Sequence, residues 1–125
     1  MFNVQLEPTI IKENLGVSRG LLSSVDPGGA YVSVAISKKA KIKQIQIRQL
    51  VGSGTFNVEF FSEVTHTDNV LSLVSDSTSD RMDMNKLDVY YQNTDTVQQS
   101  IIYLKINPVA GLGHTFTYAL FFEKM

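Results

Sequence analysis

The sequence predicts an all-β fold, an antiparallel β-sandwich or jelly roll of about seven or eight strands. Apolar residues repeatedly alternate with polar ones, which is the period of a strand with one buried face. Turns rich in glycine and proline separate these runs at spacings typical of a sandwich. The best helical candidate, residues 8–22, contains Gly16 and Gly20, each costing roughly 1 kcal/mol relative to alanine inside a helix.

The first 25 residues admit two interpretations. Such a segment forms either an arm that lies over its own domain or a neighbour, or the ordinary first strand of the domain. We expect the β-sandwich domain to occupy residues 26–125, beginning with the Asp-Pro-Gly-Gly turn at residues 26–29. As an arm, the segment would contact a neighbouring subunit through its apolar side chains, which are Phe2, Val4, Leu6, Ile10 and Ile11.

Two strands are expected after this turn. In residues 30–37 the apolar positions share one parity. In residues 38–50 the parity changes between Ile42 and Ile45. One extra residue near Lys43 would reconcile the two parts, so we predict a β-bulge there.

The middle of the chain predicts three further strands. Residues 55–61 alternate, with Phe61 as an additional aromatic residue that faces solvent or a partner. Residues 70–74 form a brief apolar strand between two polar loops. Residues 82–91 form the next strand, interrupted or bulged near residues 85–86.

Residues 97–125 are predicted to form a β-hairpin around a glycine-bearing turn at residues 108–113. Its aromatic side is expected to face the core, opposite the strand at residues 55–61. The opposite parity of the same two strands places Tyr103 and Phe121 outside. We therefore predict that these two aromatic residues contact another subunit.

The composition indicates a globular domain, because 43% of the residues are hydrophobic and 18% are charged. The net charge of −1 gives no overall attraction to nucleic acid or to an anionic membrane. Up to Leu50 the chain has seven Lys/Arg and three Asp/Glu, and from Val51 onward it has four and nine. The two halves meet across a sandwich, or copies of the protein meet head to tail, or the difference is an accident of loop composition.

The densest positive charge lies in the strand at residues 38–50. Lys39, Lys41 and Lys43 share one face of that strand, and three interpretations remain open. They guard an edge strand against unwanted pairing, bind an acidic protein partner, or bind nucleic acid. We expect no nucleic-acid partner, because single-strand binding requires exposed aromatic residues among the basic ones, and none lies between Tyr31 and Phe56.

No motif indicates catalysis. The chain has no cysteine, which excludes disulfides, thiolate metal sites and a cysteine nucleophile. Residues 16–20 match the Gly-x-Ser-x-Gly elbow of hydrolases, but that elbow requires a helix after the serine, and Pro27 arrives too soon. His66 and His114 are expected to be exposed in loops. We therefore expect no enzyme activity and no cofactor.

Neither a metal site nor a membrane segment is expected. The acidic residues between positions 76 and 88 lack the spacing of an EF-hand. No apolar run approaches the length of a membrane-spanning helix, and the N-terminus lacks the pattern of a signal peptide. We expect the product to be made in a cytosol.

Four segments carry a resemblance to a known class of proteins. They are GTFNVEFFS (54–62), DVYYQN (88–93), IYLKIN (102–107) and YALFFE (118–123). Together they resemble the small β-sandwich and jelly-roll domains of tailed-phage virion proteins, such as capsid decoration proteins and head or tail accessory proteins. The resemblance lies in strand order and turn placement and covers roughly residues 30–125. It implies a non-enzymatic structural role in a virion assembled in the host cytoplasm, with other virion proteins and copies of the chain itself as partners, most often as a trimer.

A glycan- or receptor-binding β-sandwich is the alternative interpretation. Sugar sites commonly use exposed aromatic rings, and this chain has no tryptophan. Tyrosines would take that role, and one of the adjacent pair Tyr90 and Tyr91 should point outward. The candidates are Tyr31, Tyr90, Tyr91 and Tyr103.

Overall fold

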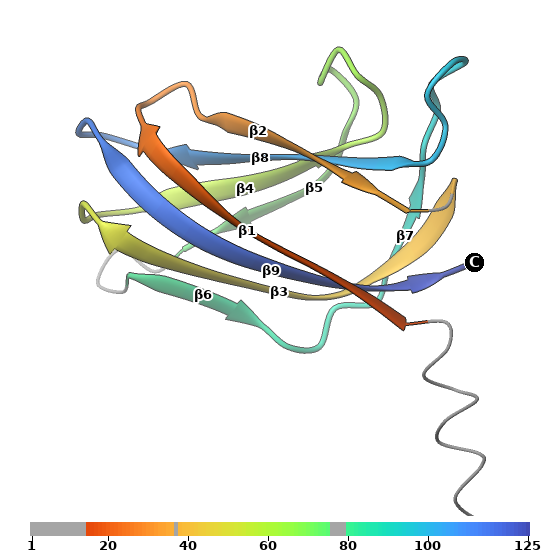
Figure 1. Cartoon of the computed structure of the whole chain (residues 1–125), viewed down its shortest axis with the longest axis horizontal. Helices are drawn as coiled ribbons and strands as arrows, with labels where there is room; N and C mark the ends of the chain where they lie inside the picture. The colour runs from red at the N-terminus through yellow and green to blue at the C-terminus, as the bar shows by residue number, and fades with distance from the viewer. Residues whose placement is uncertain (1–14, 37, 76–79) are drawn as a thin grey trace, which may run out of the picture.

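The computed structural model describes residues 15–36, 38–75 and 80–125, which form two antiparallel sheets packed face to face (Figure 1). The prediction of an all-β sandwich is confirmed. This part of the chain contains no helix able to span a membrane. Its nine strands are β1 (Leu15–Val25), β2 (Ala30–Ala35), β3 (Lys39–Val51), β4 (Phe56–Phe61), β5 (Asn69–Val74), β6 (Arg81–Met84), β7 (Val89–Gln92), β8 (Ile101–Pro108) and β9 (His114–Lys124).

The strands pair in nested order. One sheet has the order β1-β9-β3-β6, with β7 pairing to the start of β3, and the other has the order β2-β8-β4-β5. The first strand thus pairs with the last, β2 with β8, β3 with β6 and β7, and β4 with β5. Because β6 and β7 both pair with β3, they act as one strand interrupted at residues 85–88, as the sequence predicted. This nesting is the topology of a jelly roll.

The predicted C-terminal hairpin is wrong. β8 pairs with β2 and β4, whereas β9 lies in the other sheet between β1 and β3 (Figure 1). The turn after Pro108 therefore carries the chain from one sheet to the other. The predicted inward faces are confirmed, since the rings of Phe56 and Phe116 meet between the sheets with centroids 5.1 Å apart.

The predicted β-bulge in β3 is confirmed and serves the core. The register between β3 and β9 shifts between Ile42 and Gln44, and this shift turns both Ile42 and Ile45 inward. The largest completely buried side chains of the core are Tyr91, Phe56, Phe60, Phe116, Ile42, Ile45, Ile47, Ile102, Leu104, Ile106 and Leu120.

The two glycines that argued against a helix have a specific place in β1. Gly16 lies directly opposite Phe122 of β9, and Gly20 lies directly opposite Tyr118. A Cβ atom on either glycine would come within 2.5 Å of the ring across from it. The glycines therefore make room for aromatic rings that cover the edge strand from inside. Ser18 lies between them in an extended strand, so the hydrolase elbow is absent.

Tyr91 ties the two sheets together. Its hydroxyl donates a hydrogen bond to the carbonyl of Phe61 at 2.6 Å and accepts one from the N–H of Tyr103 at 3.2 Å. Tyr91 belongs to β7, whereas its partners belong to β4 and β8 of the other sheet. Burial raises the pKa of Tyr91 to about 12.

Candidate functional site

The outer face of the β1-β9-β3-β6 sheet carries a regular array of side chains. Two neighbouring cross-strand rows, set by the strand register, lie at its centre. Residues that alternate with these rows along the strands, such as Ile47 and Leu120, are buried in the core. Because successive side chains of a strand point to opposite faces, both rows point away from the core. One row is Leu21, Thr117, Arg48 and Arg81, and the other is Arg19, Ala119, Gln46 and Asp83.

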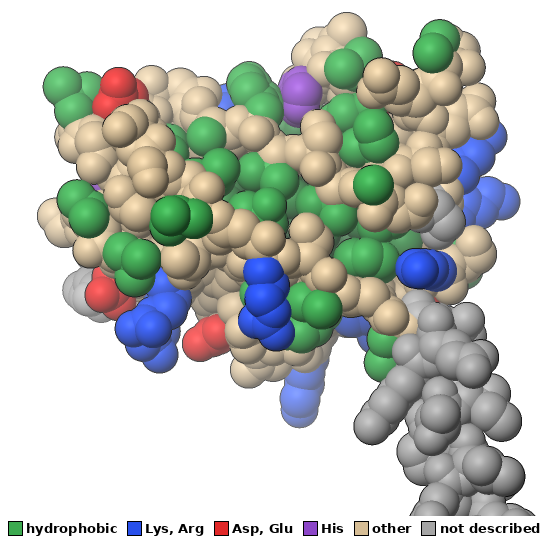
Figure 2. All heavy atoms as spheres, viewed as in Figure 1, with side chains coloured by type: hydrophobic (Ala, Val, Ile, Leu, Met, Phe, Trp, Pro, Cys, Tyr) green, Lys and Arg blue, Asp and Glu red, His purple; other side chains and the backbone are tan. Residues whose placement is uncertain are grey.

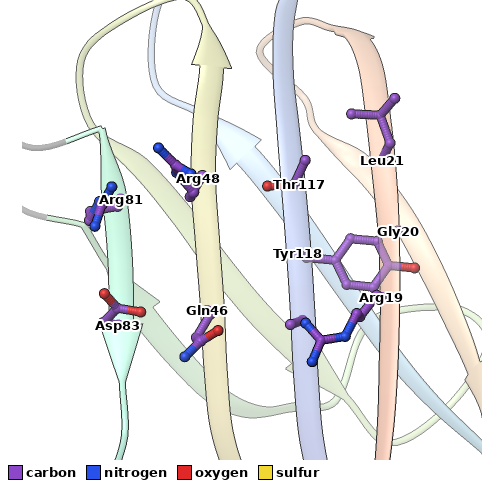
Figure 3. A pocket seen from close by; sticks show the side chains of 10 residues that line it. Arg19, Gly20, Leu21, Gln46, Arg48, Arg81, Asp83, Thr117 and Tyr118 are labelled. Carbon is purple, nitrogen blue, oxygen red and sulfur yellow. The ribbon is translucent and has the colours of Figure 1, made fainter.

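These rows line a shallow groove of about 700 Å³, which we call the arginine groove. It gathers all three arginines of the chain, which come from β1, β3 and β6. Figure 3 shows the Arg19 side chain reaching from β1 toward β9, with Arg48 and Arg81 side by side on β3 and β6. The groove is lined by Arg19, Gly20, Leu21, Gln46, Arg48, Arg81, Asp83, Thr117, Tyr118 and Ala119.

Arg19 is held over the sheet by an aromatic ring. Its guanidinium carbon lies 5.5 Å from the ring centroid of Phe121, a cation–π distance. Phe121 is half-buried on the outer parity of β9, as predicted. It thus lies on the surface beside the arginine groove, and its contact with another subunit stays a prediction.

The edge strand β1 presents an apolar outer face. Leu15, Val17 and Leu21 are 47%, 49% and 60% exposed. In the described part of the chain, β1 pairs only with β9, so its other edge leaves backbone groups available for pairing. Its sequence LGVSRGLLSSV contains no lysine and no proline, which commonly guard an edge, and its one charged residue, Arg19, lies over the Phe121 ring of β9.

Figure 2 shows apolar and basic side chains in the same view. Hydrophobic side chains gather in the middle, between the places of β2 and β1 in Figure 1, and Lys and Arg side chains project along the lower edge, where β3 and β6 lie. A surface that combines apolar area with arginine is typical of protein interfaces.

The lysines of β3 do not guard an edge, so that interpretation is wrong. β3 is a central strand, with β9 on one side and β6 and β7 on the other. Lys43 Nζ lies 2.9 Å from Asp88 Oδ1 and Lys41 Nζ lies 3.9 Å from the same oxygen, while Lys39 is exposed. The hydrogen bond between them raises the pKa of Lys43 and lowers that of Asp88. At this contact, the halves of opposite charge meet within one sheet rather than across the sandwich.

The prediction that Tyr103 lies on the outer surface and contacts another subunit is wrong, because the residue is only 2% exposed. It has the predicted outer parity on β8, but the loop after β4 covers it, with the His66 ring 5.5 Å away. Its hydroxyl donates to Asp95 Oδ2 at 2.6 Å, and burial raises its pKa to about 12. Phe61, expected to face solvent or a partner, is buried beside the same histidine.

The prediction that His114 is exposed is also wrong, since the residue is buried. Nδ1 lies 2.6 Å from Gln49 Oε1, and Nε2 lies 2.9 Å from the carbonyl of Ala110. Gly52, with a φ of 94°, leaves the space that the imidazole fills. The imidazole thus joins the end of β3 to the turn after β8, and each of its ring nitrogens contacts a group other than a serine among the described residues.

The described residues contain no group of three or more His, Asp or Glu side chains placed to hold a metal ion. Glu63 instead closes the loop after β4, where it accepts hydrogen bonds from the N–H groups of Thr65, Thr67 and Asp68. These bonds, with that of the Thr65 hydroxyl first, lower the pKa of Glu63 to about 2. Its carboxylate is therefore a structural group.

The four tyrosines proposed for glycan binding differ in exposure. Tyr91 is buried and Tyr90 is exposed, so the prediction that one of the pair points outward is confirmed. Tyr31 is also exposed, but it lies on β2 of the other sheet. The exposed rings of Tyr31 and Tyr90 therefore belong to opposite faces, and glycan binding stays a prediction.

Five of the predicted contact residues, Phe2, Val4, Leu6, Ile10 and Ile11, lie outside the described residues. Of the segment 1–25, residues 15–25 form β1. Sequence reasoning missed the apolar face of β1 and the grouping of Arg19, Arg48 and Arg81. Parity alone could have placed these side chains outward, but their proximity depends on the register of four strands.

Comparison with known proteins finds solved structures with a similar fold. No protein-family model matches the chain, and no curated protein matches it. A chain in the capsid of cyanophage Pam1 is similar at a TM-score of 0.51 and 9% identity, with 90% of this chain and 86% of that chain covered.

Two further solved structures have lower scores. A chain of the Bacillus endospore appendages, a family of disulfide-linked pili, has a TM-score of 0.49 at 11% identity, covering 90% of each chain. A chain in the capsid of Helicobacter pylori bacteriophage KHP30 has a TM-score of 0.48 at 12% identity, covering 89% of each chain. At these identities the likeness concerns the fold alone.

Proposed function

We propose that the protein is a non-enzymatic structural component of a virus particle, of the capsid-decoration kind, present in the virion and assembled in the host cytoplasm. In this role it contacts other virion proteins and copies of itself, as a closed homo-oligomer and most often a trimer. The jelly-roll topology and the likeness to the Pam1 capsid chain support the class of protein.

The observation that carries the proposal is the outer face and open edge of β1. Three apolar side chains, Leu15, Val17 and Leu21, are about half exposed along a strand of 11 residues. An edge of this length without lysine or proline is a site for pairing with another chain. The apolar side chains add area whose burial favours association by roughly 25 cal/mol per Å².

Light scattering coupled to size exclusion tests self-association. We expect the wild-type protein to elute as an oligomer and Val17→Lys to elute at the mass of a monomer, because lysine places a charge in the apolar contact. Leu112→Lys is the matched control. Leu112 is 80% exposed in the turn between β8 and β9, so this variant should keep the wild-type mass. A wild-type monomer, or equal masses for both variants, would contradict the proposal.

A further inference from the structure

We propose that the arginine groove binds an extended acidic segment of a partner protein, with Arg19 and Arg48 pairing with its carboxylates. This inference goes beyond the proposed function, because it concerns a heterologous peptide rather than self-association through β1. It rests on the groove lining, the strand register and the charges of the outer face.

The cationic groups stand at a spacing that suits an extended chain. Arg19 and Arg48 lie on β1 and β3, two strands apart, in neighbouring rows of the array. Strands are about 4.8 Å apart and successive residues on one face about 6.8 Å apart, so the two Cα atoms are separated by roughly 12 Å. A peptide crossing the groove would meet one guanidinium and then the other.

Arginine is the side chain best suited to this task. Its planar guanidinium offers parallel donors to the two oxygens of a carboxylate. Arg19 is positioned by its contact with Phe121, which reduces the entropy lost when it binds. Between the arginines, Thr117 and Gln46 are half-buried groups able to hydrogen-bond with a peptide backbone.

The floor of the groove favours a peptide over nucleic acid. Leu21 and Ala119 give it apolar patches between the charges. Asp83, on β6 in the same lining, repels any anion, so a bound carboxylate is directed toward Arg19 and Arg48 on β1 and β3. A peptide that alternates acidic and apolar residues matches this mixture, because carboxylates meet arginines while apolar side chains meet the patches.

Outside the groove, part of the positive charge of this face is neutralised. Further along β3, Asp88 already pairs with Lys41 and Lys43. The face therefore lacks the long continuous basic track that nucleic-acid binding requires. Discrete carboxylates are the better match to the two separate guanidiniums of Arg19 and Arg48.

Selection from a random library of displayed peptides of about 12 residues tests the inference. We expect the enriched peptides to alternate Asp or Glu with apolar residues. A labelled enriched peptide should bind roughly tenfold more weakly to Arg19→Gln and to Arg48→Gln, because each change removes a charge-assisted pair. It should also bind much more weakly when its own acidic residues are replaced by amides.

Lys105→Gln is the matched control. It removes one positive charge on β8 of the other sheet, where Lys105 lies over the Tyr31 ring, and should leave binding within about twofold. Leu15→Lys, which also places a charge in the apolar face of β1, should still bind the peptide, because Leu15 lies opposite Glu123 and does not line the groove. Peptide binding by a variant that no longer self-associates would show that the two proposals stand or fail independently.

Three results would overturn the inference. The first is a selected pool with no excess of acidic residues. The second is peptide binding that Arg19→Gln and Arg48→Gln leave unchanged. The third is a single-stranded DNA of about 12 nucleotides that binds more tightly than the peptide and loses affinity in the same arginine variants.

Discussion

Replacing Tyr91 with phenylalanine tests how the two sheets are held together. The change removes one hydroxyl and leaves the ring in the core. The Phe61 carbonyl and the Tyr103 N–H then lose the partner that stands 2.6 and 3.2 Å away. A buried polar group left unpaired costs about 1–3 kcal/mol, so we expect the free energy of unfolding to fall by about 2 kcal/mol. For a domain of this size, the melting temperature should fall by roughly 6–10 °C.

Tyr90→Phe is the matched control for this substitution. The Tyr90 hydroxyl donates to Gln92 Oε1 at 3.1 Å on the exposed side of the same strand. Its removal should change stability by less than about 0.5 kcal/mol. Urea unfolding followed by circular dichroism gives both values. Equal stability of Tyr91→Phe and wild type, or equal losses in the two variants, would refute the cross-sheet role of Tyr91.

Three further predictions concern the edge strand and two titrating groups. Gly20→Ala should cost about 1–3 kcal/mol by overpacking, and adding Tyr118→Ala should recover part of that loss, measured as a double-mutant cycle. Because the pKa of Tyr91 rises from 10.0 to about 12, the native state keeps a proton that the unfolded state loses. Wild-type stability should therefore fall between pH 10 and 12, and less so in Tyr91→Phe. The pKa of Glu63 falls from 4.5 to about 2, so its contribution is complete above pH 4.5 and lost toward pH 2. Urea unfolding should accordingly show Glu63→Gln less stable than wild type at pH 7, with the difference shrinking as the pH falls toward 2.

The features that the sequence predicted correctly are local ones. The parity change between Ile42 and Ile45 required an extra residue, and the structure has a register shift at that point. The Asp-Pro-Gly-Gly turn forms as expected, with the Gly29 N–H donating to the carbonyl of Asp26 at 3.0 Å and Gly28 at positive φ. In each case, the responsible residues are neighbours in the chain.

The features that the sequence did not predict depend on distant segments. Alternation in residues 97–125 identified inward faces, but the partner of a strand is set by the whole sheet, so β8 and β9 were wrongly paired. Tyr103 and His114 have the sequence context of exposed residues, and they are buried because loops from elsewhere in the chain cover them. The arginine groove also depends on segments that are distant in the sequence, since its arginines come from β1, β3 and β6.

The central claim is that β1 is a contact surface between subunits, and hydrogen exchange at different protein concentrations tests it most directly. Oligomerisation makes protection depend on concentration by mass action. We predict that the backbone N–H groups of Leu15–Val25 exchange more slowly as the concentration rises, whereas those of β8, already paired on both sides, do not change. Exchange in Leu15–Val25 that is independent of concentration up to the hundred-micromolar range would contradict the claim.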